Sequence, residues 1–446
     1  MSAISEQSVR VSQGSAEELA VIDKVSRRLV WFLVVLFFIS YLDRINISFA
    51  ALSMNKDLGL TATMFGFATS IFYVAYLCAE IPSNMLMPYF GARIWIPRIM
   101  ITWGLASVAT LFATGPNSLY VLRVIVGLAE AGFVPGILLY ITYWFPATHR
   151  ARATSFFIMA QPITIMIGST ISGLILEMHG FFGLKGWQWL FLLEGLPAIV
   201  LGVVAYFYLD DNPTKAKWLT PREKEVLAEA IARDDLVAPK NKSEGSRFGM
   251  VSEFFSAPVL LLSFTYVGLV VSLVTNSSWV PQIVRAVHPN ADFLIIGVIG
   301  AIPALAAVLV MPQWGKHSDN TNERKWHVAL PMIVAAAGWM MVAWLESPVA
   351  KLVGLILCAV GTFSAQGIFW TLPPLFLSPK ARPIGIAMIS TIGLLGTSIG
   401  PITVGWLKDY TGTFGAGLSF VAGCVIAGAL AVIIMQSHTS SPERRS

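Results

Sequence analysis

Long apolar stretches alternate with short polar ones along almost the whole chain of 446 residues. Each apolar stretch holds about 20 residues or more, which is the length that an α-helix needs to cross a bilayer. The pattern therefore predicts an all-α membrane protein with twelve transmembrane helices. The stretches cover residues 29–51, 64–88, 95–114, 118–145, 153–177, 187–209, 256–284, 293–314, 327–345, 350–377, 383–407 and 414–436.

A polar segment at residues 210–255 divides the twelve predicted helices into two sets of six. It contains one predicted surface helix, because Thr220 is a good N-cap residue, Pro221 suits the first helical position and Glu223 completes a capping box. A solvated linker is the simplest interpretation of this helix, and a regulatory partner site is the alternative. The predicted regions are a cytoplasmic N-terminal tail (1–28), a first six-helix half (29–209), a cytoplasmic linker with a short amphipathic helix (210–255), a second six-helix half (256–436) and a cytoplasmic C-terminal tail (437–446).

The two halves repeat each other in sequence. Gly173–Glu177 near the end of the fifth stretch matches Gly405–Asp409 near the end of the eleventh. The loop from Pro88 to Arg93 matches the loop from Asp319 to Arg324 at nearly the same offset. Many secondary transporters consist of two such halves, with the solute site near the bilayer midplane between them. The pattern alone therefore predicts a carrier with two lobes.

Lysine and arginine residues are unevenly distributed between the loops on the two sides of the membrane. Loops with more of these residues face the cytoplasm, so both termini and the central linker are predicted to be cytoplasmic in a multi-pass membrane protein. Fourteen basic residues lie on the predicted cytoplasmic side: Lys24, Arg27, Arg28, Arg93, Arg98, Arg150, Arg152, Lys316, Arg324, Lys325, Lys380, Arg382, Arg444 and Arg445. Five lie on the other side: Lys56, Lys185, Arg285, Lys351 and Lys408.

The composition excludes a soluble globular protein. Charged residues make up 12% of the chain and hydrophobic ones 56%, whereas soluble domains are about 25% charged. The net charge of +5 does not indicate nucleic-acid binding, because the basic residues lie in short loops between apolar stretches. Cys78, Cys358 and Cys424 all fall inside apolar stretches, so we expect packing residues and not a disulfide or metal site.

Asp43 and Arg44 lie inside the first apolar stretch. Each would cost about 2.5–3.5 kcal/mol at the centre of a membrane helix, so such residues face a protein interior or a water-filled cavity and have partners. A structural ion pair is one interpretation. The sharper one is that the two residues line a polar path for a charged solute.

Arg123 and Glu130 lie in the fourth stretch. Seven residues make nearly two helical turns, so both side chains project from one face. Gly127, Gly132 and Pro135 are expected to allow close helix packing or a bend. A structural network joining the fourth helix to the first is one interpretation. Burial also favours the protonated form of a carboxyl group, which suggests that Glu130 gains and loses a proton during transport.

One loop sequence resembles the signature of the major facilitator superfamily. Gly315 and Asp319, with Arg324 after them, match that cytoplasmic signature in the second half. Gly91 and Arg93 match it in the first half, where Pro88 occupies the position at which the family usually has aspartate. The resemblance implies the major facilitator fold over about residues 29–435 and a gating role for the matched residues.

Two further segments resemble the anion:cation symporter family within that superfamily, and most of all the bacterial permeases for tartrate, phthalate and hydroxyphenylacetate. They are Tyr41-Leu42-Asp43-Arg44-Ile45-Asn46 and Glu80-Ile81-Pro82-Ser83-Asn84. The resemblance implies import of a small organic acid with protons and no other cofactor, across a bacterial inner membrane. A monomer is the default that the resemblance implies.

The same resemblance assigns roles to individual residues. It implies that Asp43 and Glu130 carry protons, that Arg44 binds the substrate carboxylate, and that Arg123 belongs to the charge network of Glu130. The remaining predicted substrate-binding residues are Tyr76, Gln161, Trp370 and Ser390; at the last of these positions the sugar-acid members of the family have asparagine.

Three other function classes compete with import. A proton-driven exporter usually has a Gly-Pro motif in the fifth helix, whereas this chain has Gln161-Pro162. A transporter-fold sensor would be expected to carry large soluble additions. An intramembrane enzyme would need a metal-ligand pair or a nucleophile beside a base, and the apolar stretches suggest neither. We therefore expect a transporter and not an enzyme.

Overall fold

The computed structural model describes residues 16–237, 256–377 and 382–435. Every regular element in these ranges is helical. The elements are α1 (Ala16–Asp57), α2 (Ala62–Phe90), α3 (Ala92–Ala109), η1 (Thr110–Phe112), α4 (Pro116–Glu130), α5 (Phe133–Trp144), α6 (Ala147–Leu176), η2 (Phe181–Gly183), α7 (Gly186–Tyr208), η3 (Pro213–Lys215), α8 (Pro221–Val237), α10 (Ala257–Val287), α11 (Phe293–Thr321), α12 (Lys325–Trp344), α13 (Pro348–Phe369), α14 (Pro373–Phe376), α15 (Arg382–Thr411) and α16 (Gly415–Ile434).

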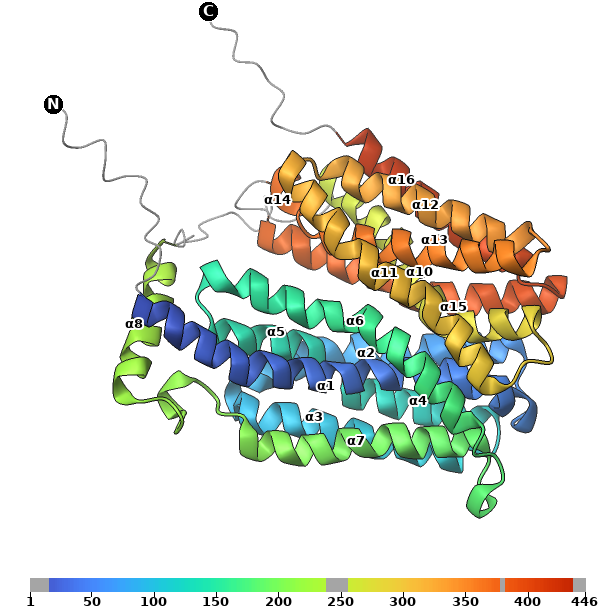
Figure 1. The fold of residues 1–446 in the computed structure, drawn as a ribbon, viewed down its shortest axis with the longest axis horizontal. Coiled ribbons are helices and arrows are strands. Elements are labelled where there is room, and N and C mark those ends of the chain that lie inside the picture. Colours follow the sequence, from blue (N-terminus) through green and yellow to red (C-terminus); the bar gives the residue numbers. More distant parts are fainter. Residues whose placement is uncertain (1–15, 238–255, 378–381, 436–446) are drawn as a thin grey trace, which may run out of the picture.

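The described residues contain twelve segments that are long and apolar enough to cross a membrane. The predicted fold class, an all-α membrane protein with twelve spans, is thereby confirmed. Helices α1 to α7 form one half and α10 to α16 form the other. Figure 1 shows the two halves lying one above the other, with α8 at the left-hand end of the molecule.

Two of the predicted spans are interrupted. In the fourth, α4 ends at Glu130 and α5 begins at Phe133, and Gly132 between them has a left-handed φ of 87° that favours glycine. The bend expected there is confirmed. In the tenth, α13 ends at Phe369 and the short α14 follows from Pro373. Pro373 cannot donate a backbone hydrogen bond that would continue the preceding helix.

The N-terminal boundary differs from the prediction. Residues 16–28, expected in the tail, form the first turns of α1. These residues are too polar to belong to the apolar pattern. Val25 is nevertheless buried in one cluster with Leu227 of α8, so tertiary packing stabilises this part of the helix. The rest of the predicted N-terminal tail (1–15), the last part of the predicted linker (238–255) and the predicted C-terminal tail (437–446) lie outside the described residues.

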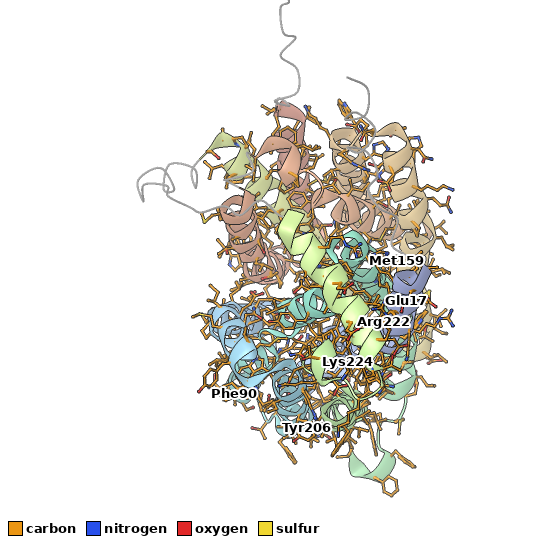
Figure 2. The ribbon with its side chains drawn as sticks, turned by 90° about the vertical axis from the view of Figure 1, so that its left-hand side faces the viewer. Glu17, Phe90, Met159, Tyr206, Arg222 and Lys224 are labelled. Atoms are coloured by element: carbon orange, nitrogen blue, oxygen red, sulfur yellow. The ribbon has the colours of Figure 1, made fainter. Side chains whose placement is uncertain are left out.

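Helix α8 begins with the predicted capping box. Thr220 N donates to Glu223 Oε2 at 2.8 Å, and Glu223 N donates to Thr220 Oγ1 at 3.3 Å. Lys24 of α1 forms an ion pair with Glu223 at 2.8 Å, and its ammonium holds the pKa of Glu223 below the ordinary value. Figure 2 shows α8 lying across this end of the molecule, with Arg222 close to Glu17 of α1. We call this end of the molecule the α8 end.

The two halves contact each other through two pairs of crossing helices, α6 with α11 and α2 with α15. Helix α1 also contacts α10. Ser70 of α2 donates from Oγ to the carbonyl oxygen of Ser398 of α15 at 2.5 Å. The crossings involve the first turns of α2 and α11 and the last turns of α6 and α15. The halves are therefore joined toward the end opposite α8, which we call the far end.

Candidate functional site

Helix α1 carries the polar residues around which the site is built. Asp43 is 2% exposed, and Arg123 and Glu130 of α4 are 3% and 0% exposed. Charged groups of this kind are tolerated in a membrane-spanning bundle only where they have partners inside the protein. The contacts of these side chains therefore determine what the site can do.

Arg44 and Glu130 form the one ion pair between spanning helices α1 and α4 in the described part of the chain. Arg44 Nε lies 2.8 Å from Glu130 Oε1, and Ser40 Oγ donates to the same oxygen at 3.2 Å. The side chain of Glu130 is fully buried, and that of Arg44 is 17% exposed. Arg44 Nη2 and Glu130 Oε2 have no hydrogen-bond partner among the described residues. The guanidinium thus retains a donor for a further anion.

Asp43 makes contacts of a different kind. Its Oδ1 accepts hydrogen bonds from Asn46 Nδ2 at 3.0 Å and from Ser107 Oγ of α3. Glu130, by contrast, forms its ion pair with Arg44. The predicted charge network of Arg123 and Glu130 therefore does not include a direct ion pair between the two.

Arg123 makes no ion pair within 4.0 Å with any carboxylate in the described ranges. Its guanidinium lies over the ring of Phe72 on α2, 4.5 Å from the ring centre, and its Nε has no hydrogen-bond partner there. A buried cation held mainly by an aromatic face is an incompletely satisfied group. It adds positive potential to the site without neutralising it.

The predicted substrate-binding residues fall into two groups. Tyr76 and Gln161 lie with Arg44 in the first half: the Arg44 guanidinium carbon is 5.1 Å from the Tyr76 ring centre, and Gln161 Nε2 donates to the Tyr41 hydroxyl at 2.8 Å. Trp370 lies in the second half and packs edge-on against Tyr266. Ser390 of α15 is half-buried in the same half.

The predicted gating residues lie toward the α8 end. In the second half, after Gly315, Arg324 pairs with Asp319 at 2.7 Å and donates to Ser318 Oγ at 2.8 Å. In the first half, Arg93 Nε instead donates to the carbonyl oxygen of Tyr206 at 3.0 Å. Pro88 replaces the expected acid there, so the equivalent ion pair cannot form. The turn before Arg93 requires Gly91, whose φ is 86°.

Sequence reasoning missed one buried acid within the predicted apolar stretches. Glu194 of α7 is 1% exposed, and its Oε1 accepts a hydrogen bond from Ser172 Oγ of α6 at 2.7 Å. Its Oε2 has no partner in the ranges that the structure covers. An acidic residue inside an apolar stretch was the signal that pointed to Asp43, and the same signal was available here.

A small cavity lies between the halves, beside α1. Ser48 of α1, Ser169 of α6, and Asn276 and Ser277 of α10 contribute its polar lining. Its volume of about 20 Å³ is sufficient for a water molecule. Ser277 also lies beside the Tyr41 hydroxyl, so α10 supplies polar groups that the sequence analysis did not assign. No cluster of metal-ligating side chains occurs among the residues described.

The family model of the Major Facilitator Superfamily matches residues 33–401. The chain belongs to this superfamily. A protein of Agrobacterium vitis named "Putative tartrate transporter" is 43% identical over 94% of this chain and 95% of its own length. The recognised family is thereby confirmed, and so is the branch of organic-anion permeases that the motifs in α1 and α2 indicated.

A second relative has a different printed function. A quinolone resistance transporter of Acinetobacter baumannii is 35% identical over 94% of this chain and 95% of its own length. Both relatives are transporters, in agreement with the expectation of a transport protein.

The fold is also found in solved structures. The xylose transporter XylE of E. coli, in an inward-open conformation, superposes with a TM-score of 0.72 over 93% of this chain and 97% of that chain, at 14% identity. Identity this low shows the fold alone. The predicted arrangement of two six-helix halves is that of the superfamily.

The geometry of the Arg44–Glu130 pair gives a stability prediction. Glu130→Ala leaves Arg44 largely buried without its countercharge, so we expect a loss of about 3 kcal/mol and a lower thermal unfolding midpoint of the detergent-purified protein. Ser40→Ala removes only one hydrogen bond to the same oxygen and should cost about 1 kcal/mol. Equal unfolding midpoints for Glu130→Ala and the parent would contradict the importance of the pair.

Proposed function

We propose that this protein is a secondary active transporter that imports a small organic anion by proton symport and alternating access. It would reside in a bacterial inner membrane with both termini and α8 in the cytoplasm. The observation that carries the proposal is the buried Arg44–Glu130 pair, because it joins a carboxylate-binding group to a protonatable group by one 2.8 Å contact. The similarity to a tartrate-type relative supports it.

The pair suggests how proton and substrate binding are coupled. While Glu130 is ionised, its carboxylate occupies one edge of the Arg44 guanidinium. Protonation of Glu130 removes the charge that holds Arg44, so the arginine becomes available to the carboxylate of a substrate. A planar guanidinium suits a carboxylate because it offers paired donors in a fixed geometry.

Asp43 is proposed as a second proton-binding group. Its hydrogen bonds from Ser107 and Asn46 are compatible with either the ionised or the protonated acid, because the carboxyl group retains another oxygen. Arg123 is a further buried cation of the site and adds positive potential to it. Arrival of an anionic substrate offsets that positive potential, so substrate and proton favour each other.

The site favours a compact acid that also carries hydrogen-bonding groups. The two arginines attract an anion. Gln161 and the Tyr41 hydroxyl bond to each other and offer neutral donors and acceptors, with Tyr41 close enough to Arg44 to interact with its charge. Tartrate, a sugar acid and an aromatic acid are the candidate substrates. Binding near the centre, followed by rocking of the two halves, would release the substrate and the protons at the α8 end.

Export by proton antiport is the second candidate. It is favoured by the similarity to the quinolone resistance transporter. Both candidates use the same fold and the same buried acids, so the direction of proton movement is the observation that separates them.

Internal pH of proteoliposomes tests the proposal directly. Purified protein would be reconstituted, and tartrate, galactonate, phthalate, hydroxyphenylacetate and glutamate added outside one at a time. Symport predicts internal acidification with one or more acids, beyond the leak of protein-free liposomes. Internal alkalinisation would indicate antiport, and labelled exchange without any pH change would contradict proton coupling.

Glu130→Gln should separate exchange from accumulation. The amide keeps the size of the side chain but cannot release a proton, so we expect proton-driven uptake to fall to the level of passive equilibration while exchange across the membrane persists. Uptake of labelled substrate with and without an imposed pH gradient measures both. Glu194→Gln is the matched control, because it alters a buried acid that has no ion pair. Parent-like accumulation by Glu130→Gln would remove Glu130 as the coupling site.

Arg44→Ala should abolish substrate binding, since it removes the proposed carboxylate ligand. Arg44→Lys should bind with affinity between those of the parent and the alanine variant, because it retains the charge without the planar fork. Substrate-induced protection against thermal unfolding measures this binding. Arg98→Ala is the control, as Arg98 stacks on Trp95 of α3. An unchanged affinity for Arg44→Ala would eliminate the assigned role.

A further inference from the structure

The repeated segment at the ends of α6 and α15 lies where the two halves meet. Gly173–Glu177 closes α6 in the first half, and Gly405–Asp409 occupies the matching position in α15 of the second half. Each segment crosses the first turn of a helix in the opposite half. Because the segments are matched by sequence and contact opposite halves, the contacts form a pseudo-symmetric pair at the far end.

Asp409 caps helix α2 across the interface. Its Oδ1 accepts a hydrogen bond from Ala62 N at 3.1 Å, and its Oδ2 accepts one from Thr63 N at 2.7 Å and one from Thr63 Oγ1 at 2.6 Å. Ala62 and Thr63 are the first two residues of α2. Their amides have no acceptor within the helix itself. An acid from the second half thus satisfies the helix start of the first.

Glu177 makes the corresponding contact in the other direction. Its Oε1 accepts a hydrogen bond from Leu294 N at 3.2 Å, and Leu294 is the second residue of α11. Arg285 lies close enough to both Glu177 and Asp292 to interact with their charges, and it donates to the carbonyl oxygen of Ala291 at 2.7 Å. An acid from the first half thus contacts the start of a helix in the second.

Glycines permit both crossings. A side chain at Gly173 would collide with the backbone of α11, and one at Gly405 would collide with the backbone of α2. The opposing helices supply Gly297 and Gly66, each four residues after the first residue of its helix, and each faces the backbone of the crossing helix. Each acid therefore lies one turn beyond a glycine that brings the two backbones together.

We propose that Glu177 and Asp409 form a two-part latch that holds the halves together at the far end, and that both caps break when that end opens. A carboxylate at the start of a helix is stabilised by the free amides and by the positive end of the helix dipole. That stabilisation exists only while the halves are in contact, so it favours the closed far end. The inference rests on the proposed alternating-access cycle for its role, but testing it requires no substrate.

Removing the charge of each acid should raise the population with an open far end. Asp409→Asn and Glu177→Gln are each expected to increase that population about 2- to 5-fold. The two acids act at separate helix crossings, so the double variant should show about the product, 4- to 25-fold. Asp57→Asn is the matched control, because Asp57 lies near the same end but bonds to Trp187 and Lys185 of its own half.

The reporter is a single cysteine at position 300, in a chain whose three native cysteines have been replaced. A side-chain carbon at Gly300 would have its nearest neighbour 3.9 Å away, so Gly300→Cys is accommodated. The position lines the small central cavity. It lies on α11, three residues after Gly297, where α6 crosses. A membrane-impermeant maleimide added to intact cells and, separately, to inside-out vesicles then measures access from each side.

The latch predicts faster labelling from the far end for both variants and parent-like labelling for Asp57→Asn. If the protein has the opposite orientation, the increase moves from cells to vesicles and the latch still stands. Hydrogen exchange at the amides of Ala62, Thr63 and Leu294 gives an independent measure and shows whether the rest of each half remains folded. Thr63→Ala, which removes one donor only, should give a smaller increase. Equal labelling of the Asp409, Glu177 and Asp57 variants, at any level, would overturn the proposal.

Discussion

The cost of placing charge inside a bilayer constrains this structure more than any other factor. Arg44 and Glu130 occupy spanning helices, where a lone charge would be unfavourable by several kcal/mol. Their 2.8 Å contact reduces that cost for both and fixes α1 against α4. Protonation of Glu130, or the arrival of a carboxylate that competes for Arg44, would weaken the attraction between the two side chains. The centre of the protein is therefore sensitive to the two species proposed to be transported.

The sequence predicted the fold because twelve apolar stretches are a local signal for twelve spans. A charge within such a stretch is also a local signal, and it marked Asp43, Arg44, Arg123 and Glu130 as candidate site residues. Their roles remain predictions. Pairing is a tertiary property, however. Helical spacing places Arg123 and Glu130 on one face, but it cannot reveal that Arg44 is the residue that contacts Glu130. For the same reason, the polar start of α1 could not be recognised as helix without knowledge of its partner α8.

Glu194 and the Gly173–Glu177 repeat differ in what the sequence could reveal. Glu194 was predictable as a buried acid, because it lies inside an apolar stretch. The repeat was recognised as evidence of two matched halves, but its contacts lie between residues far apart in the chain, such as Asp409 and Thr63. Internal sequence similarity shows which positions correspond. It does not show that corresponding positions bind across the pseudo-symmetry axis.

The two ends of the molecule use their charged groups differently. Toward the α8 end, Arg324 pairs with Asp319 and Arg93 binds the carbonyl oxygen of Tyr206, so these contacts remain within one half. At the far end, Glu177 and Asp409 bind the opposite half. In the proposed alternating-access cycle, contacts within a half would be preserved, whereas contacts between halves would be exchanged. Each cap contributes about 0.3–1 kcal/mol, which is small enough for that exchange. A substrate can shift the equilibrium between two states of a carrier only by the difference in its binding free energy for them.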